Sequence, residues 1–275
     1  MALGITGAVS LSGRVLEMVR PGAALRAAAL VLAVLAVTPA AHAGHAKIRG
    51  GKDVLRAMHD RYQHDWYETL TFEQTSTTHN PDGTSKSETW YEAALLPGNL
   101  RIDIGDPSQG NGALIAGGTM TRFRDGKVAT SRPFVHMLLV LGFDVYRQPA
   151  QRTIEQVAGQ GYDLAKLHED TWQGAPVYVV GADAGDLTTR QFWIDKKRLL
   201  FVRIIEPDQN DNSKTDDIRF MDYRKVSPGW VAARVELYVA GKNVFSERYA
   251  DIRVNPKLDP AIFDPRQFTK QHWEK

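Results

Sequence analysis

The sequence of 275 residues contains no cysteine. Disulfide frameworks, thiolate zinc sites, iron–sulfur clusters and cysteine nucleophiles are therefore excluded within it. A diacylated lipoprotein anchor is excluded too, because that anchor is attached to a cysteine at the cleavage site. A strong charge of either sign is also lacking, since 34 Lys and Arg face 32 Asp and Glu. This balance gives no support for a nucleic-acid partner.

Motifs that carry catalysis are scarce. The sequence has no Gly-x-Ser-x-Gly elbow and no glycine-rich phosphate loop between a strand and a helix. His59 and His64 are five residues apart on a predicted helix and do not form the i, i+4 pair of a metal site. We therefore expect a protein that is not an enzyme and that holds no cofactor and no metal.

The N-terminal segment has the features of an export signal. Ala27–Val37 is an apolar run of 11 residues, preceded by arginines and followed by Ala41-His42-Ala43, a small-x-small cleavage pattern. The run is too short to cross a bilayer, which takes ~20 residues. We expect residues 1–43 to be a cleavable signal peptide, with translation starting at Met18. The remaining residues 44–275 carry 31 basic and 31 acidic side chains and form one predicted domain.

Most of the mature chain alternates apolar and polar residues, with short turns between the runs. An amphipathic helix is predicted over Asp53–Gln63, and the following strands begin at Thr69–Thr75. Leu100–Ile104 should point Leu100, Ile102 and Ile104 inward, with Arg101 and Asp103 outward. Short links imply antiparallel neighbours. The proline-rich Asn255–Phe268 should fold back as a series of turns.

The middle of the chain breaks this pattern. Phe134–Phe143 is apolar except for His136 and Gly142, and the preceding Pro133 is typical of a helix start. A helix that is apolar on all sides must be buried or must contact another apolar surface. Two interpretations stay open: a displaceable lid over the sheet, or a plain core helix. His136 is either a ligand contact, a pH-sensitive latch or a satisfied buried histidine.

The faces of the later strands suggest burial on both sides of the sheet. Leu199–Ile205 is apolar on both faces apart from Arg203. A sheet wetted on one side does not show this pattern. The second apolar face is therefore covered either by the protein's own helices or by the contents of an apolar cavity.

These features together resemble a known superfamily. The export signal, the early helix, the antiparallel meander with a helical insertion, Arg190–Asp195 (R-Q-F-W-I-D), Arg219–Tyr223 (R-F-M-D-Y) and the closing Asn255–Phe268 are similar to LolA-like, outer-membrane lipoprotein-sorting proteins. The resemblance spans roughly residues 50 to 268. It implies an α+β fold in which a strongly curved antiparallel sheet, an incomplete β-barrel, has helices plugging its open concave side.

The resemblance also implies a function. Members hold acyl chains or other lipids in the hydrophobic concavity while carrying them across the periplasm. It implies a soluble periplasmic carrier of a lipid or lipoprotein acyl chain, served by membrane-anchored donor and acceptor proteins. The residues expected to line the cavity are Phe72, Trp90, Leu100, Ile102, Ile104 and Trp193. The residues expected to form the lid are Phe134, Met137, Leu138 and Leu141.

Two other classes of function stay open at this point. The same fold could serve a periplasmic sensor or regulatory module that binds a protein partner. It could also shape the pocket of a small-molecule enzyme. The length of the chain and its C-terminal proline segment go beyond a compact general lipoprotein carrier, which indicates a dedicated ligand at least as much as bulk lipoprotein traffic.

Overall fold

The computed structural model describes residues 47–208, 211 and 213–269. The predicted signal peptide and Met18 lie outside these residues. Within the described part of the chain, no helix is long and apolar enough to span a membrane.

The first element is the predicted amphipathic helix, α1 (Gly51–Tyr62). Its apolar side chains recur at helical spacing, so that Val54, Leu55 and Met58 are fully buried. The helix begins two residues earlier than the periodicity predicts. At Gly51 a Cβ atom would lie 2.4 Å from Val180, so only glycine permits the helix to pack this closely on the sheet.

All strands belong to one antiparallel sheet of 13 strands, in the order β6-β5-β4-β3-β2-β1-β13-β12-β11-β10-β9-β8-β7. The first and last strands, β1 and β13, pair with each other at its centre. In chain order the strands are β1 (Thr69–His79), β2 (Ser85–Leu95), β3 (Asn99–Ile104), β4 (Gly112–Ala116), β5 (Thr119–Arg124), β6 (Lys127–Pro133), β7 (Leu167–Trp172), β8 (Ala175–Val180), β9 (Gln191–Asp195), β10 (Phe201–Pro207), β11 (Thr215–Lys225), β12 (Trp230–Val239) and β13 (Lys242–Val254).

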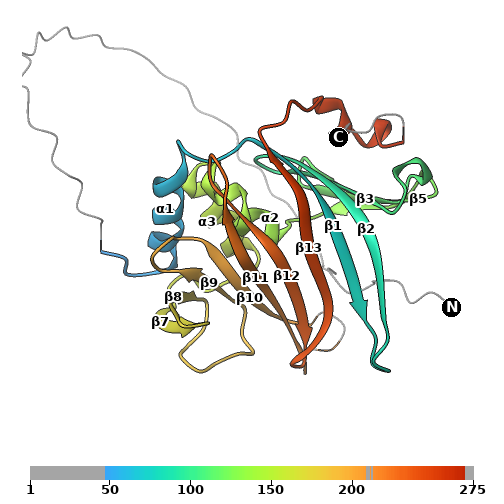
Figure 1. The fold of residues 1–275 in the computed structure, drawn as a ribbon. Coiled ribbons are helices and arrows are strands. Elements are labelled where there is room, and N and C mark those ends of the chain that lie inside the picture. The colour runs from blue at the N-terminus through green and yellow to red at the C-terminus, as the bar shows by residue number, and fades with distance from the viewer. Residues whose placement is uncertain (1–46, 209–210, 212, 270–275) are drawn as a thin grey trace, which may run out of the picture.

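The sheet is curved and open, and the helices gather on its concave face (Figure 1). These are α1, α2 (Met137–Gly142) and α3 (Ala150–Gly159), with the short 3-10 turn η2 (Asp144–Tyr146) between the last two. The main hydrophobic core lies between the helices and the sheet. The predicted fold class, a curved antiparallel sheet with helices over its concave side, is confirmed.

The convex face is also covered at one end, which corrects one sequence prediction. Arg101 and Asp103 point away from the helices as predicted, yet they are 1% and 0% exposed rather than solvated. The C-terminal segment folds back over them through the 3-10 turns η3 (Pro260–Phe263) and η4 (Pro265–Gln267). The Phe268 ring stacks on Phe123 at 3.9 Å between centroids.

The apolar middle segment also starts differently from the prediction. Pro133 ends strand β6 and does not open the helix, which begins four residues later at Met137. The imidazole of His136 caps α2, since Nδ1 accepts a hydrogen bond from the Leu139 N–H at 3.2 Å. A proline suits the first turn of a helix, but here its extended backbone serves the sheet edge instead.

Candidate functional site: a pocket under helix α2

A cavity of about 160 Å³ lies between α2 and the central strands. Strands β1, β2, β3, β11, β12 and β13 form one side, and the segment 136–143 forms the other. Most lining residues are apolar, with His136 and two carboxyl groups among them. They are Leu70, Phe72, Trp90, Glu92, Ala94, Leu100, Ile102, His136, Leu138, Leu139, Phe143, Phe220, Val235, Glu247 and Tyr249.

Half of the predicted site residues line this cavity. Phe72, Trp90, Leu100 and Ile102 contribute from strands β1 to β3, and Leu138 contributes from the predicted lid. Strand alternation explains the agreement, because residues two apart face the same side of a sheet. Ile104 is opposite Trp90 in the strand register but does not line the cavity.

The other lid residues pack around the cavity without lining it. Leu141 and Met137 are buried in the main core, at 0% and 8% exposure. The Phe134 ring meets His136 edge-on, 5.5 Å between centroids. Leu139 and Phe143, which the sequence analysis left out of the lid, take the lining positions instead. These side chains point into the cavity because α2 begins at Met137. A helix beginning at another residue would turn other side chains inward.

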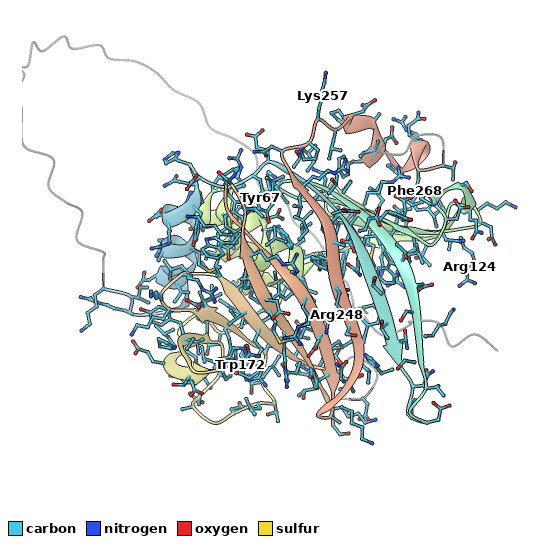
Figure 2. All side chains as sticks on the ribbon, viewed as in Figure 1. Tyr67, Arg124, Trp172, Arg248, Lys257 and Phe268 are labelled. Carbon is cyan, nitrogen blue, oxygen red and sulfur yellow. The ribbon has the colours of Figure 1, made fainter. Side chains whose placement is uncertain are left out.

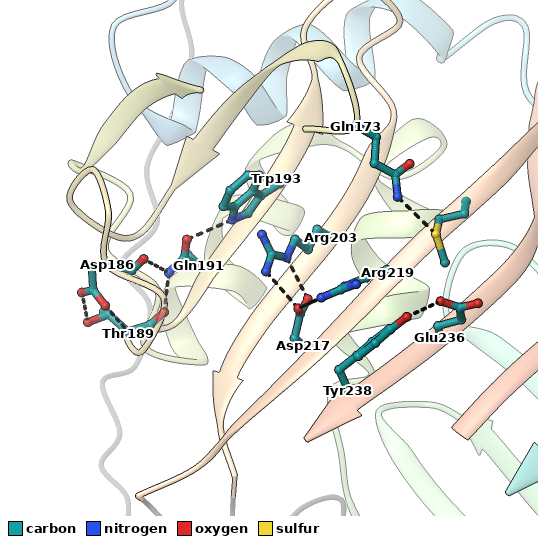
Figure 3. Close-up of polar contacts among 11 residues, drawn as sticks. Gln173, Asp186, Thr189, Gln191, Trp193, Arg203, Asp217, Arg219, Glu236 and Tyr238 are labelled. Atoms are coloured by element: carbon teal, nitrogen blue, oxygen red, sulfur yellow. Dashed lines mark hydrogen bonds and ion pairs between the residues drawn. The ribbon is translucent and has the colours of Figure 1, made fainter. Parts of the chain in front are cut away.

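Trp193 lies on the opposite face of the sheet from the cavity. Its neighbours Phe192 and Ile194 face the main core, so alternation turns Trp193 outward. There its indole donates a hydrogen bond to Gln191, and the Arg203 guanidinium lies 4.5 Å from its ring centroid (Figure 3). The prediction therefore placed Trp193 on the wrong face of the sheet. It considered that the residue is apolar, but not which face alternate residues of strand β9 take.

Arg203 is held in a stack of aromatic and charged groups on this convex face. Its guanidinium lies 4.3 Å from the Trp172 ring centroid and is bonded to both oxygens of Asp217, at 2.7 and 2.9 Å. Arg219 shares Asp217 and lies over Tyr238 (Figure 3). The two guanidinium groups therefore share one carboxylate, and this surface is built from hydrogen-bonded ion pairs and cation–π contacts.

A second cavity of about 230 Å³ lies beside this stack. Its lining includes the charged side chains Asp195, Arg198 and Asp222 together with Gln173. Trp172 lines this cavity and lies far from Phe268 of the C-terminal segment (Figure 2). Although this cavity is larger, its polar lining suits water better than an apolar ligand. The cavity under α2 is the one with an apolar lining and a helix over it.

The segment over the cavity is fastened at both ends. At its start, the Phe134 N–H donates to the Gly118 carbonyl at 2.9 Å. At its end, the buried Asp144 carboxyl accepts a hydrogen bond from the Gly98 N–H at 2.9 Å, and burial raises the pKa of Asp144 to about 7. Tyr146 is fully buried, with its ring centroid 4.0 Å from that of Trp66. The middle of the segment, where Leu138 lies, is therefore the part best placed to move.

Gly142 lets α2 sit close to the sheet. A Cβ atom at this position would lie 3.2 Å from the Phe220 ring, which itself lines the cavity. The contact is van der Waals in nature, and no hydrogen bond or ion pair joins α2 to a strand among the described residues. Apolar packing therefore holds the helix down, and such packing can be exchanged for packing against a ligand.

The surroundings of His136 predict an unusually low pKa for its imidazole. Burial lowers the pKa of its imidazole to about 4, and the capping bond to Leu139 requires a neutral ring with the proton on Nε2. An unfolded histidine takes up its proton near pH 6.5. The contribution of the cap to stability is therefore complete above pH 6.5 and is lost as the pH falls towards 4.

This expectation is checked by following the His136 ring protons by NMR between pH 3 and 8. A midpoint near 4 agrees with the closed, capped geometry. A midpoint near 6.5 contradicts it, because the imidazole would then be solvated and free of Leu139.

The cavity also contains polar residues that the sequence analysis missed. Glu92 and Glu247 line it from β2 and β13, the two strands that flank β1, and the Tyr249 hydroxyl donates to Glu247 at 2.9 Å. A signal was present for Glu92, which shares its strand face with Trp90 and Ala94. For Glu247 the signal was weaker, since a bulge between β1 and β13 shifts the register that sets its partners.

These carboxyl groups do not belong to a metal-binding cluster within the part of the chain that the structure describes. Among the described residues, no group of three or more His, Cys, Asp or Glu side chains is placed to hold a metal ion. What the arrangement offers chemically is an apolar enclosure with one acidic wall.

Similarity to known proteins is found among solved structures. No protein-family model matches the chain, and no curated protein matches it in sequence. Among solved structures, a DUF1329 family protein from Desulfovibrio piger is 14% identical, with a TM-score of 0.48, over 78% of this chain and 95% of that chain.

A LolA superfamily protein from Nitrosomonas europaea is also 14% identical, with a TM-score of 0.47, over 76% of this chain and 96% of its own. A domain of a putative outer membrane lipoprotein-sorting protein from Vibrio parahaemolyticus is 10% identical, with a TM-score of 0.49, over 80% and 98%. Two of these three similar structures are thus a LolA superfamily protein and a lipoprotein-sorting protein domain.

Proposed function

We propose that the protein is a periplasmic carrier that binds a hydrophobic ligand, a lipid or a lipoprotein acyl chain, in the cavity under α2. The observation that carries this proposal is an apolar cavity closed by a helix that only apolar packing holds in place. Residues 44–275 act as one domain after removal of the signal peptide, and the protein binds and releases its ligand without catalysis. Membrane-anchored donor and acceptor proteins are its expected partners.

The physical need for such a carrier is clear. Each CH₂ group exposed to water costs ~0.8 kcal/mol, so an acyl chain crosses an aqueous compartment only when it is enclosed. Among the described residues, the large hydrophobic side chains that are exposed are Val128 and Leu187, which lie far apart in the sequence. Enclosure must therefore use the interior cavity and not an apolar surface patch.

The size of the cavity implies that α2 moves. At about 160 Å³ it matches the ~150 Å³ engineered cavity that admits benzene, and it is too small for a whole acyl chain. A longer chain fits only if Leu138, Leu139 and Phe143 withdraw. The fastened ends of the segment and its weakly held middle are suited to this displacement. We expect the ligand to replace these side chains against the same strands.

Filling the cavity from the sheet side tests this proposal. Ala94 lines the cavity and is 2% exposed, so Ala94→Phe places a ring where the ligand would lie. The affinity for dodecanol, measured by titration calorimetry, should fall at least ~10-fold, because excluding two CH₂ groups already costs ~1.6 kcal/mol. Ala158→Phe makes the same change at an exposed site on α3 and should bind as the wild type does. Equal binding by Ala94→Phe and the wild type would place the ligand elsewhere.

A further inference from the structure

The acidic wall of the cavity has no counter-ion. No Arg or Lys lies among the described residues that line the pocket, although it contains both Glu92 and Glu247. Glu92 is 7% exposed, and no described residue donates a hydrogen bond to its carboxyl group. A buried carboxyl group without a partner carries a free-energy cost of several kcal/mol when it is ionised. Such a group calls for an explanation beyond packing.

The strand register brings the acidic groups together around β1. Phe72 on β1 is opposite Glu92 on β2, and Ser76 is opposite Glu247 on β13. Between them, Gln74 is fully buried, and its Oε1 atom has no hydrogen-bond partner. Gln74 Nε2 donates to Ser76 at 2.8 Å. This strip of the concave face is therefore rich in acceptors and short of donors.

The electrostatics of the pair point the same way. Burial and the neighbouring Glu247 charge raise the pKa of Glu92 well above its usual range. Burial also raises the pKa of Glu247, and hydrogen bonds from Tyr249 and Gln74 oppose that rise only in part. Two carboxyl groups in an apolar site do not both ionise without a cation. Without a bound cation, the pair of carboxyl groups is therefore partly protonated near neutral pH.

We propose that the pocket selects a cationic amphiphile, a hydrophobic molecule whose protonated amine donates hydrogen bonds to Glu92 and Glu247. Its apolar part lies against Leu138, Leu139 and Phe143. An alkylammonium group supplies up to three N–H donors and the positive charge that the wall lacks, whereas a carboxylate or phosphate would be repelled by it. This inference rests on the proposed carrier function and adds the chemical class of the ligand's buried polar group.

Three probes of equal chain length test the inference: octylamine, octanol and octanoate. At pH 7 they are a cation, a neutral molecule and an anion, since alkylamines ionise near the value of lysine, ~10.4. Titration calorimetry of the wild type should give octylamine an affinity at least ~10-fold above that of octanol, with octanoate weakest. Binding of octylamine at pH 6 should also release protons into the buffer, because the cation favours ionised carboxyl groups. Octanol should release none.

The variants Glu92→Gln and Glu247→Gln, alone and combined, keep the shape of the wall and remove its charge. We expect the preference for octylamine over octanol and the proton release to disappear in these variants. Glu155→Gln removes an exposed carboxyl group from α3 and should change neither quantity. Circular dichroism checks that each variant folds. If the double variant does not fold, the two single variants are compared with the wild type instead.

The outcomes separate the two proposals. Binding of all three probes with equal affinity overturns the inference about the amine and leaves the hydrophobic pocket in place. Tighter binding of octanoate than of octylamine overturns it as well. Failure of the wild type to bind any of the three overturns the carrier function together with the inference.

Discussion

The variant Arg101→Met will lower the free energy of unfolding by about 3–5 kcal/mol, the cost of breaking a buried ion pair from one side. Arg101 and Asp103 are 1% and 0% exposed, and the guanidinium contacts both carboxylate oxygens at 2.7 and 2.9 Å. Methionine fills the space of the arginine stem but leaves the Asp103 charge buried without this partner. Few other single substitutions in this protein should cost as much.

Arg101 also fastens the C-terminal segment. Its guanidinium donates to the carbonyl oxygens of Ile262 and Phe268, at 3.2 and 2.7 Å, and lies 4.3 Å from the Phe268 ring centroid. Loss of the arginine should therefore release residues 258–268 to proteolysis before the rest of the chain unfolds.

Urea unfolding followed by circular dichroism measures the effect. The double variant Arg101→Met/Asp103→Leu is the matched control, since replacing both partners of a buried pair by apolar residues is often neutral. It should recover the part of the cost that comes from the unpaired Asp103 charge, but not the part that comes from the lost hydrogen bonds to Ile262 and Phe268. A cost below about 1 kcal/mol for Arg101→Met alone would show that the pair is solvated and that the C-terminal segment does not cover it.

The variant Leu138→Asp will abolish binding of hydrophobic probes by displacing α2. Leu138 lines the cavity, so aspartate there adds a third carboxyl group to a space that already contains Glu92 and Glu247. An unpaired carboxylate in an apolar site costs several kcal/mol, so the closed position of α2, which buries this carboxylate, becomes less favourable. The helix should therefore leave the sheet while its fastened ends stay in place.

Two measurements follow this change. Dodecanol affinity should fall by more than ~10-fold, and chymotrypsin should cut faster at Leu139 and Phe143, which lie within the displaced segment. Val128→Asp makes a comparable change at a side chain that is 58% exposed and should leave both quantities unaltered. Dodecanol binding at the wild-type level in Leu138→Asp would contradict the role of α2 as a lid.

The sequence predicts the fold well because strand alternation and turn residues are local signals. The Asn80–Gly83 turn and the strands on either side of it follow from a few neighbouring residues, and Gly83 adopts the positive φ of +86° that the turn needs. The same alternation places Phe72 and Trp90 on the cavity side. Local patterns therefore determine which face a side chain takes.

Local patterns do not reveal what covers each face. Arg101 and Asp103 look solvated in the sequence because their cover, Ile262 and Phe268, lies about 160 positions away along the chain. Glu92 looks solvated for the same reason, but on the other face of the sheet. Its cover is α2, which closes the pocket over it only in the folded protein. The start of α2 depends on whether Pro133 joins the sheet edge. This pairing with β5 is a tertiary contact that the local sequence does not determine.

The most direct test of the account is native mass spectrometry of the protein produced with its own N-terminal segment in a Gram-negative host, followed by organic extraction of anything bound. We predict a discrete hydrophobic adduct on the wild type and on Ala158→Phe, and its absence from Ala94→Phe. A wild-type protein that is repeatedly empty and binds neither dodecanol nor octylamine would contradict the claim that the cavity under α2 carries a ligand.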